Sequence, residues 1–157
     1  MATTLCGFDD GPQGTGQGLL VQFGPTLIVD IGFDAAYNAA VRGPPDLPIK
    51  GVHALVDTGA TISCIDSGLA MQLNLPIIDR QRFGGAGGAH EANMHLGQIY
   101  VPNLDRTIYG SFASVDLVAG GQQHVALIGR TFLRHFTMRY LGRTGTVSLS
   151  DDPDGSS

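Results

Sequence analysis

Short runs of apolar and β-branched residues, separated by glycine, proline and polar residues, set the pattern of this chain. Runs of this length with turn residues at both ends are typical of β-strands rather than of long helices. The runs that we interpret as strands are residues 19–23, 26–33, 49–56, 61–65, 99–101, 111–118 and 125–128. The pattern therefore predicts an all-β fold.

Two segments have a different pattern and predict helix. Residues 67–73 fit one or two helical turns before Pro76, and residues 130–135 follow a glycine and give the strongest helix prediction. After them, residues 136–140 and 146–149 flank a glycine-containing turn and predict a closing hairpin. The chain has no internal repeat of fixed period.

The two ends contain little that a core would bury. Residues 1–17 are rich in Gly, Thr, Gln and Asp, and residues 151–157 are acidic and polar. We expect a flexible leader at 1–17 and a flexible acidic tail at 151–157. With 157 residues in all, the segment between them, 18–150, fits a single folded domain.

Composition and charge exclude several classes of function. The formal charge is −5, and the nine Lys and Arg residues are scattered, whereas a nucleic-acid phosphate backbone needs a basic stripe. No apolar run is long enough to span a membrane, and residues 1–18 lack the features of a secretory signal, so we expect a soluble, cytoplasmic protein. The two cysteines, Cys6 and Cys64, form no Cys-x-x-Cys pair and are expected to be free thiols.

The triplet Asp57-Thr58-Gly59 is the strongest candidate for chemistry. By itself Asp-Thr-Gly is also the composition of an ordinary polar turn. Here residues 54–56 before it and 60–62 after it are mostly apolar, so the carboxylate lies at the end of a strand that should be buried. Carboxylates in such places are unfavourable unless they are paired or functional.

A second motif and a glycine cluster accompany the triplet. Residues 125–129 form an apolar strand that ends in Gly129 just before the predicted helix, and the glycine cluster 84–88 between the two motifs predicts a hairpin tip. Together, Leu-Val-Asp-Thr-Gly-Ala and Ala-Leu-Ile-Gly-Arg-Thr-Phe-Leu closely resemble the two signature segments of retroviral-type aspartic peptidases, the retropepsin-like family. The resemblance extends from about residue 26 to residue 140.

That resemblance implies a fold and a set of site residues. The fold would be an all-β half-barrel with a flap hairpin and one short C-terminal helix. The catalytic residue would be Asp57, and the glycine cluster would be the flap over the substrate. Residues expected to contact the substrate are Thr58, Gly59, Ala60, Gly85, Ala86, Gly87 and Ile128. With Ile62 and Ile78, Ile128 would give the subsites apolar walls.

The chemistry of this family requires a second carboxylate. Hydrolysis of a peptide bond by water needs a base and an acid, and two adjacent carboxylates that share one proton supply both. Because the chain has a single Asp-Thr-Gly, the resemblance implies a homodimer in which Asp57 meets its own copy at a two-fold axis. We therefore expect an endopeptidase that needs no metal and no cofactor. It should work best at acidic to mildly acidic pH and cut between apolar side chains.

Some residues depart from the retroviral pattern. The acid that follows Asp-Thr-Gly-Ala in retroviral enzymes, where it pairs with the Arg of the second signature, is Thr61 here, so Arg130 needs another partner. The chain also has a Pro-rich insertion at 43–48. Its C-terminal hairpin is more similar to cellular and bacterial relatives.

Alternative interpretations involve other residues. His90 and His95 bracket Glu91, but their spacing is one residue too long for the zinc-binding helix of metallopeptidases, so no metal site is expected. Cys64 fits a buried apolar role better than a catalytic one, and Asp66 and Asp116 are interpreted as solvated turn or rim residues. The main rival function is a retropepsin-like module that dimerises or binds peptides without catalysis.

Overall fold

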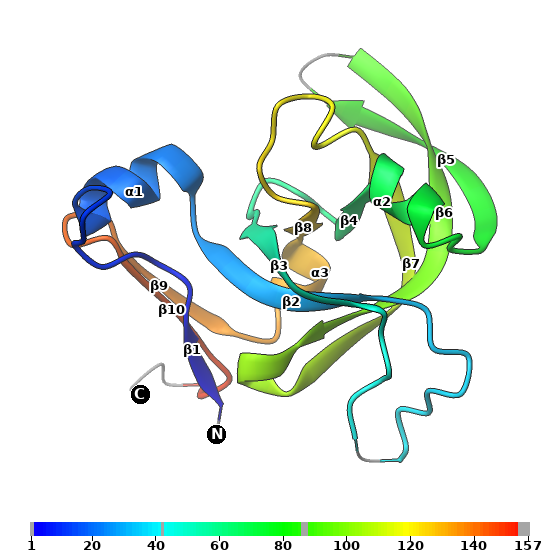
Figure 1. Ribbon diagram of the computed structural model, residues 1–157, viewed down its shortest axis with the longest axis horizontal. Coiled ribbons are helices and arrows are strands. Elements are labelled where there is room, and N and C mark those ends of the chain that lie inside the picture. Colours follow the sequence, from blue (N-terminus) through cyan, green and yellow to red (C-terminus); the bar gives the residue numbers. More distant parts are fainter. Residues whose placement is uncertain (1, 42, 86–87, 154–157) are drawn as a thin grey trace.

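The computed structural model describes residues 2–41, 43–85 and 88–153 of the chain. Over these ranges most of the regular structure is β-strand, and the helices are short (Figure 1). The all-β prediction is therefore confirmed. No helix within the described ranges is both long and apolar enough to cross a membrane.

Seven strands form one sheet that curves back on itself. Their order is β2 (Thr26–Gly32), β3 (Ile49–Val56), β8 (Ala126–Ile128), β4 (Cys64–Asp66), β7 (Arg106–Val115), β6 (Gly88–Val101) and β5 (Ile77–Gly85). Because β2 also pairs with β6, the sheet closes into a barrel, with β5 outside the ring as a second partner of β6. The pairs β3–β8 and β4–β7 are parallel and the others are antiparallel.

The barrel encloses the main core. Its inward-facing side chains are aliphatic or aromatic and almost fully shielded from solvent, and each such Val, Leu, Ile or Phe stabilises the fold by about 1.5–3 kcal/mol. Buried members on the barrel strands are Leu27, Val29, Ile31, Ala54, Val56, Ile65, Ile99, Val101, Phe112, Ala126 and Ile128.

The two ends of the chain form a second, three-stranded sheet in the order β1 (Thr3–Leu5), β10 (Thr146–Ser150) and β9 (Thr137–Leu141). The hairpin β9–β10 confirms the predicted closing hairpin. However, β1 pairs along its length with β10, and the following Cys6 is only 2% exposed. The expectation of a loosely packed leader is thus wrong for residues 3–6, because strand pairing with the far end of the chain orders them.

Residues 19–23 were predicted to be a strand, and this is wrong. They belong to helix α1 (Gly16–Phe23), whose Thr15 side chain accepts a hydrogen bond from the Gly18 N–H as an N-cap. The helix buries Leu20 on one side, and Gly24, with φ 73°, ends it. Over so few residues, a short helix with one apolar face and a short apolar strand have similar sequence patterns.

The other predicted helices are confirmed. Helix α2 (Ser67–Gln72) and helix α3 (Arg130–Leu133) lie where the pattern placed them, and a short 3-10 helix, η1 (Pro102–Leu104), joins β6 to β7. The glycine cluster closes the hairpin of β5 and β6, in which Gly85 pairs with Gly88. Figure 1 shows the end of this hairpin at which Gly85 and Gly88 pair, at one extremity of the molecule.

Candidate active site

Asp57 lies at the end of β3, where the strand leaves the barrel. The parallel pairing of β3 with β8 sets Val56 opposite Ile128, and the Asp57 N–H donates a 2.9 Å hydrogen bond to the Ile128 carbonyl. The Val56 N–H donates to the Pro25 carbonyl on the other side at 2.8 Å. The backbone that carries the carboxylate is therefore anchored on both sides, while the Asp57 side chain is half-buried.

The turn after Asp57 fixes the direction of the carboxylate. The Gly59 N–H donates to Asp57 Oδ1 at 2.9 Å, and the Ala60 N–H donates to the Asp57 carbonyl at 3.2 Å. A Cβ on Gly59 would lie 3.1 Å from the same Oδ1, which is tighter than most real contacts. Thr58 and Gly59 themselves are exposed, so the outer edge of this turn faces solvent.

The second signature segment packs directly on this turn. The Arg130 N–H donates to the Ala60 carbonyl at 2.9 Å, and the Gly129 N–H donates to Ser63 Oγ at 3.0 Å. A Cβ on Gly129 would lie 2.5 Å from the backbone of Ile62. Glycine is thus required here because two backbone segments approach more closely than any side chain allows.

The partners of the Arg130 side chain are both on the turn that follows Asp57. Nη1 donates to the Thr58 carbonyl at 2.8 Å, and Nη2 donates to Thr61 Oγ1 at 3.1 Å. Within the part of the chain that the structure describes, Arg130 forms no ion pair with a carboxylate. The residue that replaces the expected acid therefore still binds the arginine, through a neutral hydroxyl.

A groove of about 700 Å³ begins beside the Asp57 turn. Its residues come from the turn (Gly59, Ala60, Thr61, Ile62), from β4 (Cys64), from the β5–β6 hairpin (Arg80, Phe83, Gly84, His90, Glu91, Ala92, Asn93) and from the end of β7 with its following residue (Ala113, Ser114, Val115, Asp116). Partly buried Ile62, Cys64 and Phe83 pack on buried Ala92 and Ala113 and give it an apolar floor.

The Cys64 thiol has a raised pKa. Burial, and to a lesser extent the charge of nearby Asp57, raises the pKa of Cys64 to about 11. Both effects disfavour the thiolate. This supports the interpretation of Cys64 as an apolar wall residue.

Only some of the residues predicted to contact the substrate line the groove. Gly59 and Ala60 line the groove, and Gly85 lies at the end of β5. Ala86 and Gly87 fall outside the described residues. Ile128 differs from the prediction, since its side chain is 0% exposed and belongs to the barrel core.

Ile128 is inward-facing because strand side chains alternate, and Ala126 and Ile128 share the buried face of β8. Its contribution to the site is the carbonyl that holds the Asp57 N–H. Of the other expected apolar walls, Ile62 lines the groove, whereas Ile78 is 53% exposed and lies outside the groove lining.

Asp66 was predicted to be a solvated residue, and this is wrong. Only 7% of it is exposed, and its carboxylate accepts three backbone hydrogen bonds, from Leu69 at 3.2 Å and from Leu117 and Val118 at 3.0 Å each. It caps α2 and also fixes the loop that follows β7. The Asp66-Ser67 start of a helical segment was a capping signal, but the long-range bonds have no local signature.

The histidines of β6 lie in different environments. His90 is exposed in the groove, whereas His95 is buried and makes hydrogen bonds to the Leu75 carbonyl at 3.1 Å and to Ser114 Oγ at 3.0 Å. Their odd separation puts them on opposite faces of the strand. Over the described ranges, no group of three His, Cys, Asp or Glu side chains is arranged to hold a metal ion.

A sequence model of the aspartyl protease family matches residues 39–132, more than half of the chain, and the match includes Asp57 and Gly129. The chain belongs to the aspartyl protease family. This confirms the family resemblance carried by the two signature segments. The matched region also contains the β5–β6 hairpin and all the residues that line the groove.

Comparison of this aspartyl protease with solved structures gives several matching chains. One is EIAV protease complexed with the inhibitor HBY-793, with 22% identity, a TM-score of 0.46, and coverage of 70% of this chain and 85% of that one. Among curated proteins no match was found.

Proposed function

We propose that this aspartyl protease chain is one subunit of a homodimeric endopeptidase whose active site contains Asp57 from each copy. The observation that carries the proposal is the way Asp57 is held. Its backbone is anchored to β8, and its carboxylate is oriented by Gly59 at the solvent-facing edge of the molecule. A carboxylate fixed in this way, beside an apolar groove, is arranged for chemistry rather than for stability.

The reaction follows from two carboxylates that hold one proton between them. A water molecule lies between the carboxylates, and the ionised one takes a proton from it. The resulting nucleophile attacks the peptide carbonyl carbon, and the protonated carboxyl donates its proton to the carbonyl oxygen. The tetrahedral intermediate then breaks its C–N bond as the carboxyl that took the water proton donates it to the leaving amine, and the other carboxylate takes back a proton from the hydroxyl of the intermediate.

A symmetric dimer provides the second carboxylate. In an isologous pair the same patch of both copies meets at the axis. Thr58 and Gly59 are exposed at the outer edge of the turn, so they are the residues that would meet their copies. Gly59 permits close approach, and the Thr58 hydroxyl would hydrogen-bond across the axis. A single chain should be inactive.

The groove would bind the substrate and the β5–β6 hairpin would cover it. The hairpin supplies Phe83, Gly84, His90 and Glu91 to one side of the groove. A hairpin that closes over a peptide excludes water and offers backbone N–H groups to the substrate. The apolar floor favours at least one apolar side chain of the peptide.

Replacement of the carboxylate tests the proposal. We expect the wild-type protein to cleave members of a peptide library, with products identified by mass spectrometry, and Asp57→Asn to cleave none. The matched control is Asp46→Asn, which removes the same charge from an exposed loop outside the groove. Cleavage that survives in Asp57→Asn would contradict the mechanism.

A second measurement tests the dimer. Activity per subunit should rise with protein concentration in step with the dimer fraction from light scattering. Inactive Asp57→Asn, mixed in excess with wild type, should suppress activity, because mixed dimers hold only one functional carboxylate. Full activity of a monomeric sample would refute the shared site. Peptide binding without cleavage would favour the non-catalytic module.

A further inference from the structure

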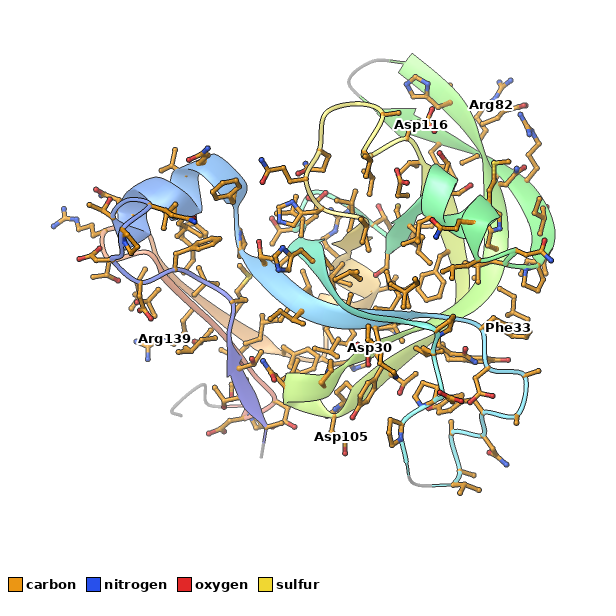
Figure 2. All side chains as sticks on the ribbon, viewed as in Figure 1. Asp30, Phe33, Arg82, Asp105, Asp116 and Arg139 are labelled. Carbon is orange, nitrogen blue, oxygen red and sulfur yellow. The ribbon has the colours of Figure 1, made fainter. Side chains whose placement is uncertain are left out.

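Asp116 is a charged residue of the groove for which catalysis has no use. It follows the last residue of β7, is exposed, and lines the groove together with residues of the β5–β6 hairpin. Figure 2 shows it near the end of the β5–β6 hairpin at which Gly85 and Gly88 pair, on the side of the molecule away from Asp30 and Asp105. The Ser67 hydroxyl, at the start of α2 and outside the groove lining, donates to Asp116 Oδ1.

The other formal charges that line the groove cancel each other. Arg80 Nε donates to Glu91 Oε2 at 3.0 Å, and Arg80 Nη1 donates to Asn93 Oδ1 at 3.2 Å. Within the described part of the chain, Asp116 forms no ion pair with Lys, Arg or His. Together with Asp57 beside the groove, it makes the lining net negative.

The strand register places an apolar surface between the catalytic turn and Asp116. In the parallel pair β4–β7, Cys64 lies opposite Ala113 and Asp66 lies opposite Val115. The groove wall therefore runs from Ile62 past Cys64 and Ala113 to Val115, and Asp116 is the next residue. At about 3.3 Å per residue, Val115 lies about 7 Å beyond the level of Ala113, and Asp116 follows it where the strand ends.

An apolar path that ends in a carboxylate with no ion-pair partner among the described residues matches a side chain with an apolar stem and a cationic head. Lysine and arginine are such side chains, since their methylene groups pack on apolar surface while the charge remains at the rim. We propose that Asp116 determines specificity for a Lys or Arg side chain of the peptide substrate, seated in the groove with its charge on Asp116. This rests on the proposed function for the peptide as ligand.

The expected preference is modest, because Asp116 is exposed. Ion pairs at such positions change an equilibrium by about two- to fivefold, and salt weakens them. An acidic side chain at the same peptide position should be disfavoured by repulsion. An uncharged side chain of similar length should bind the floor and leave Asp116 in water.

Matched peptides test the assignment. The peptides are identical except at one position, which carries Lys, norleucine or Glu, and the varied position is moved along the peptide in turn. At one position the wild type should have a higher kcat/KM for Lys than for norleucine, and Glu should be lowest. Asp116→Asn should lower the ratio of the Lys to the norleucine kcat/KM by about two- to fivefold.

Three controls give the result its meaning. Asp46→Asn should leave the ratio unchanged, Asp116→Glu should largely retain it, and the wild-type ratio should shrink at high salt. A purely structural role of Asp116 would lower cleavage of all three peptides alike. An unchanged ratio in Asp116→Asn, or no preference for Lys at any position, would overturn the proposal.

Binding separates this inference from the catalytic proposal. Fluorescence anisotropy of the labelled Lys and norleucine peptides is measured on Asp57→Asn and on the double variant Asp57→Asn with Asp116→Asn. If the wild type cleaves no peptide, the proposed endopeptidase fails, yet tighter binding of the Lys peptide that disappears in the double variant would still support the role of Asp116. Equal binding of both peptides by Asp57→Asn would refute it.

Discussion

Arg130 donates a 2.8 Å hydrogen bond from Nη1 to the carbonyl oxygen of Thr58, the residue next to the candidate catalytic carboxylate. The same guanidinium reaches the Thr61 hydroxyl at 3.1 Å. One side chain of the second signature segment thus holds both ends of the turn that carries Asp57. Both of its acceptors are uncharged, so this contact consists of hydrogen bonds and is not an ion pair.

Replacement of Arg130 by Met should therefore loosen the turn without removing any group that touches the substrate. We expect kcat to fall about ten- to hundredfold with little change in KM, because small displacements of catalytic groups have effects of this size. The loss of stability should be about 1 kcal/mol, as for typical hydrogen bonds. Steady-state kinetics and urea unfolding measure both quantities.

Arg139→Met is the matched control for Arg130→Met. Arg139 is exposed on β9, distant from the Asp57 turn, and Figure 2 shows it on the far side of the molecule from Asp116. The Arg139→Met substitution removes the same charge as Arg130→Met and should leave kcat unchanged. An equal loss in both variants would mean that net charge, rather than the bonds to Thr58 and Thr61, matters.

Gly129→Ala should damage the fold around the site. The added Cβ would meet the Ile62 backbone at 2.5 Å and the Ala60 carbonyl at 3.0 Å, and neither is a flexible side chain that can move aside. We expect a loss of at least about 2 kcal/mol in unfolding free energy. Gly11→Ala, where a Cβ would contact nothing within 4 Å, should change stability by less than about 0.5 kcal/mol. Equal stability of the two variants would show that the turn can shift.

These contacts show which parts of the site were predictable from sequence. Asp57, the glycine hairpin and helix α3 were predicted, because an apolar run into Asp-Thr-Gly and a glycine before a helix are local patterns. The inward orientation of Ile128 was missed, since it depends on which face of β8 the barrel buries. The partners of Arg130 could not be predicted from the sequence, because its acceptors are a hydroxyl and a backbone carbonyl, which carry no charge.

The missed elements depend on contacts between distant residues. Strand β1 forms because the other end of the chain offers an edge at β10, and Asp66 is buried because the loop after β7 brings two N–H groups to it. Helix α1 has a local signal in Thr15, but its few apolar residues also fit a strand. In each case tertiary pairing decides among local alternatives.

His124 should make the stability of this aspartyl protease depend on pH. It is 3% exposed, its Nε2 lies 2.7 Å from Thr26 Oγ1, and its Nδ1 lies 2.7 Å from Gln122 Oε1. Burial, and to a lesser extent His53, lowers the pKa of His124 from its ordinary value of 6.5. The unfolded chain therefore takes up a proton before the folded one does, and stability present above pH 6.5 is lost as pH falls through the lowered pKa.

Thermal unfolding from pH 8 to pH 4 measures this effect. His124→Gln should show a flatter stability profile between the two pKa values, although its stability at pH 8 should be lower because the ring contacts are lost. The exposed His135→Gln is the control and should follow the wild type. If His124→Gln has the same pH slope as wild type, protonation of His124 does not limit stability in acid.

Cys64 should be an unreactive thiol although it lines the groove. Burial and then the Asp57 charge raise the pKa of Cys64 from 9.0 to about 11, so the thiolate fraction at pH 8 should be about a hundredfold below that of an ordinary thiol. In a Cys6→Ser background, iodoacetamide should label Cys64 slowly at pH 8 and at the ordinary rate in urea. Asp57→Asn should speed labelling of the folded protein, because the nearby negative charge is removed. Rapid labelling of the folded protein at pH 8 would contradict the raised pKa of Cys64. No effect of Asp57→Asn would show that the Asp57 charge does not influence the thiol.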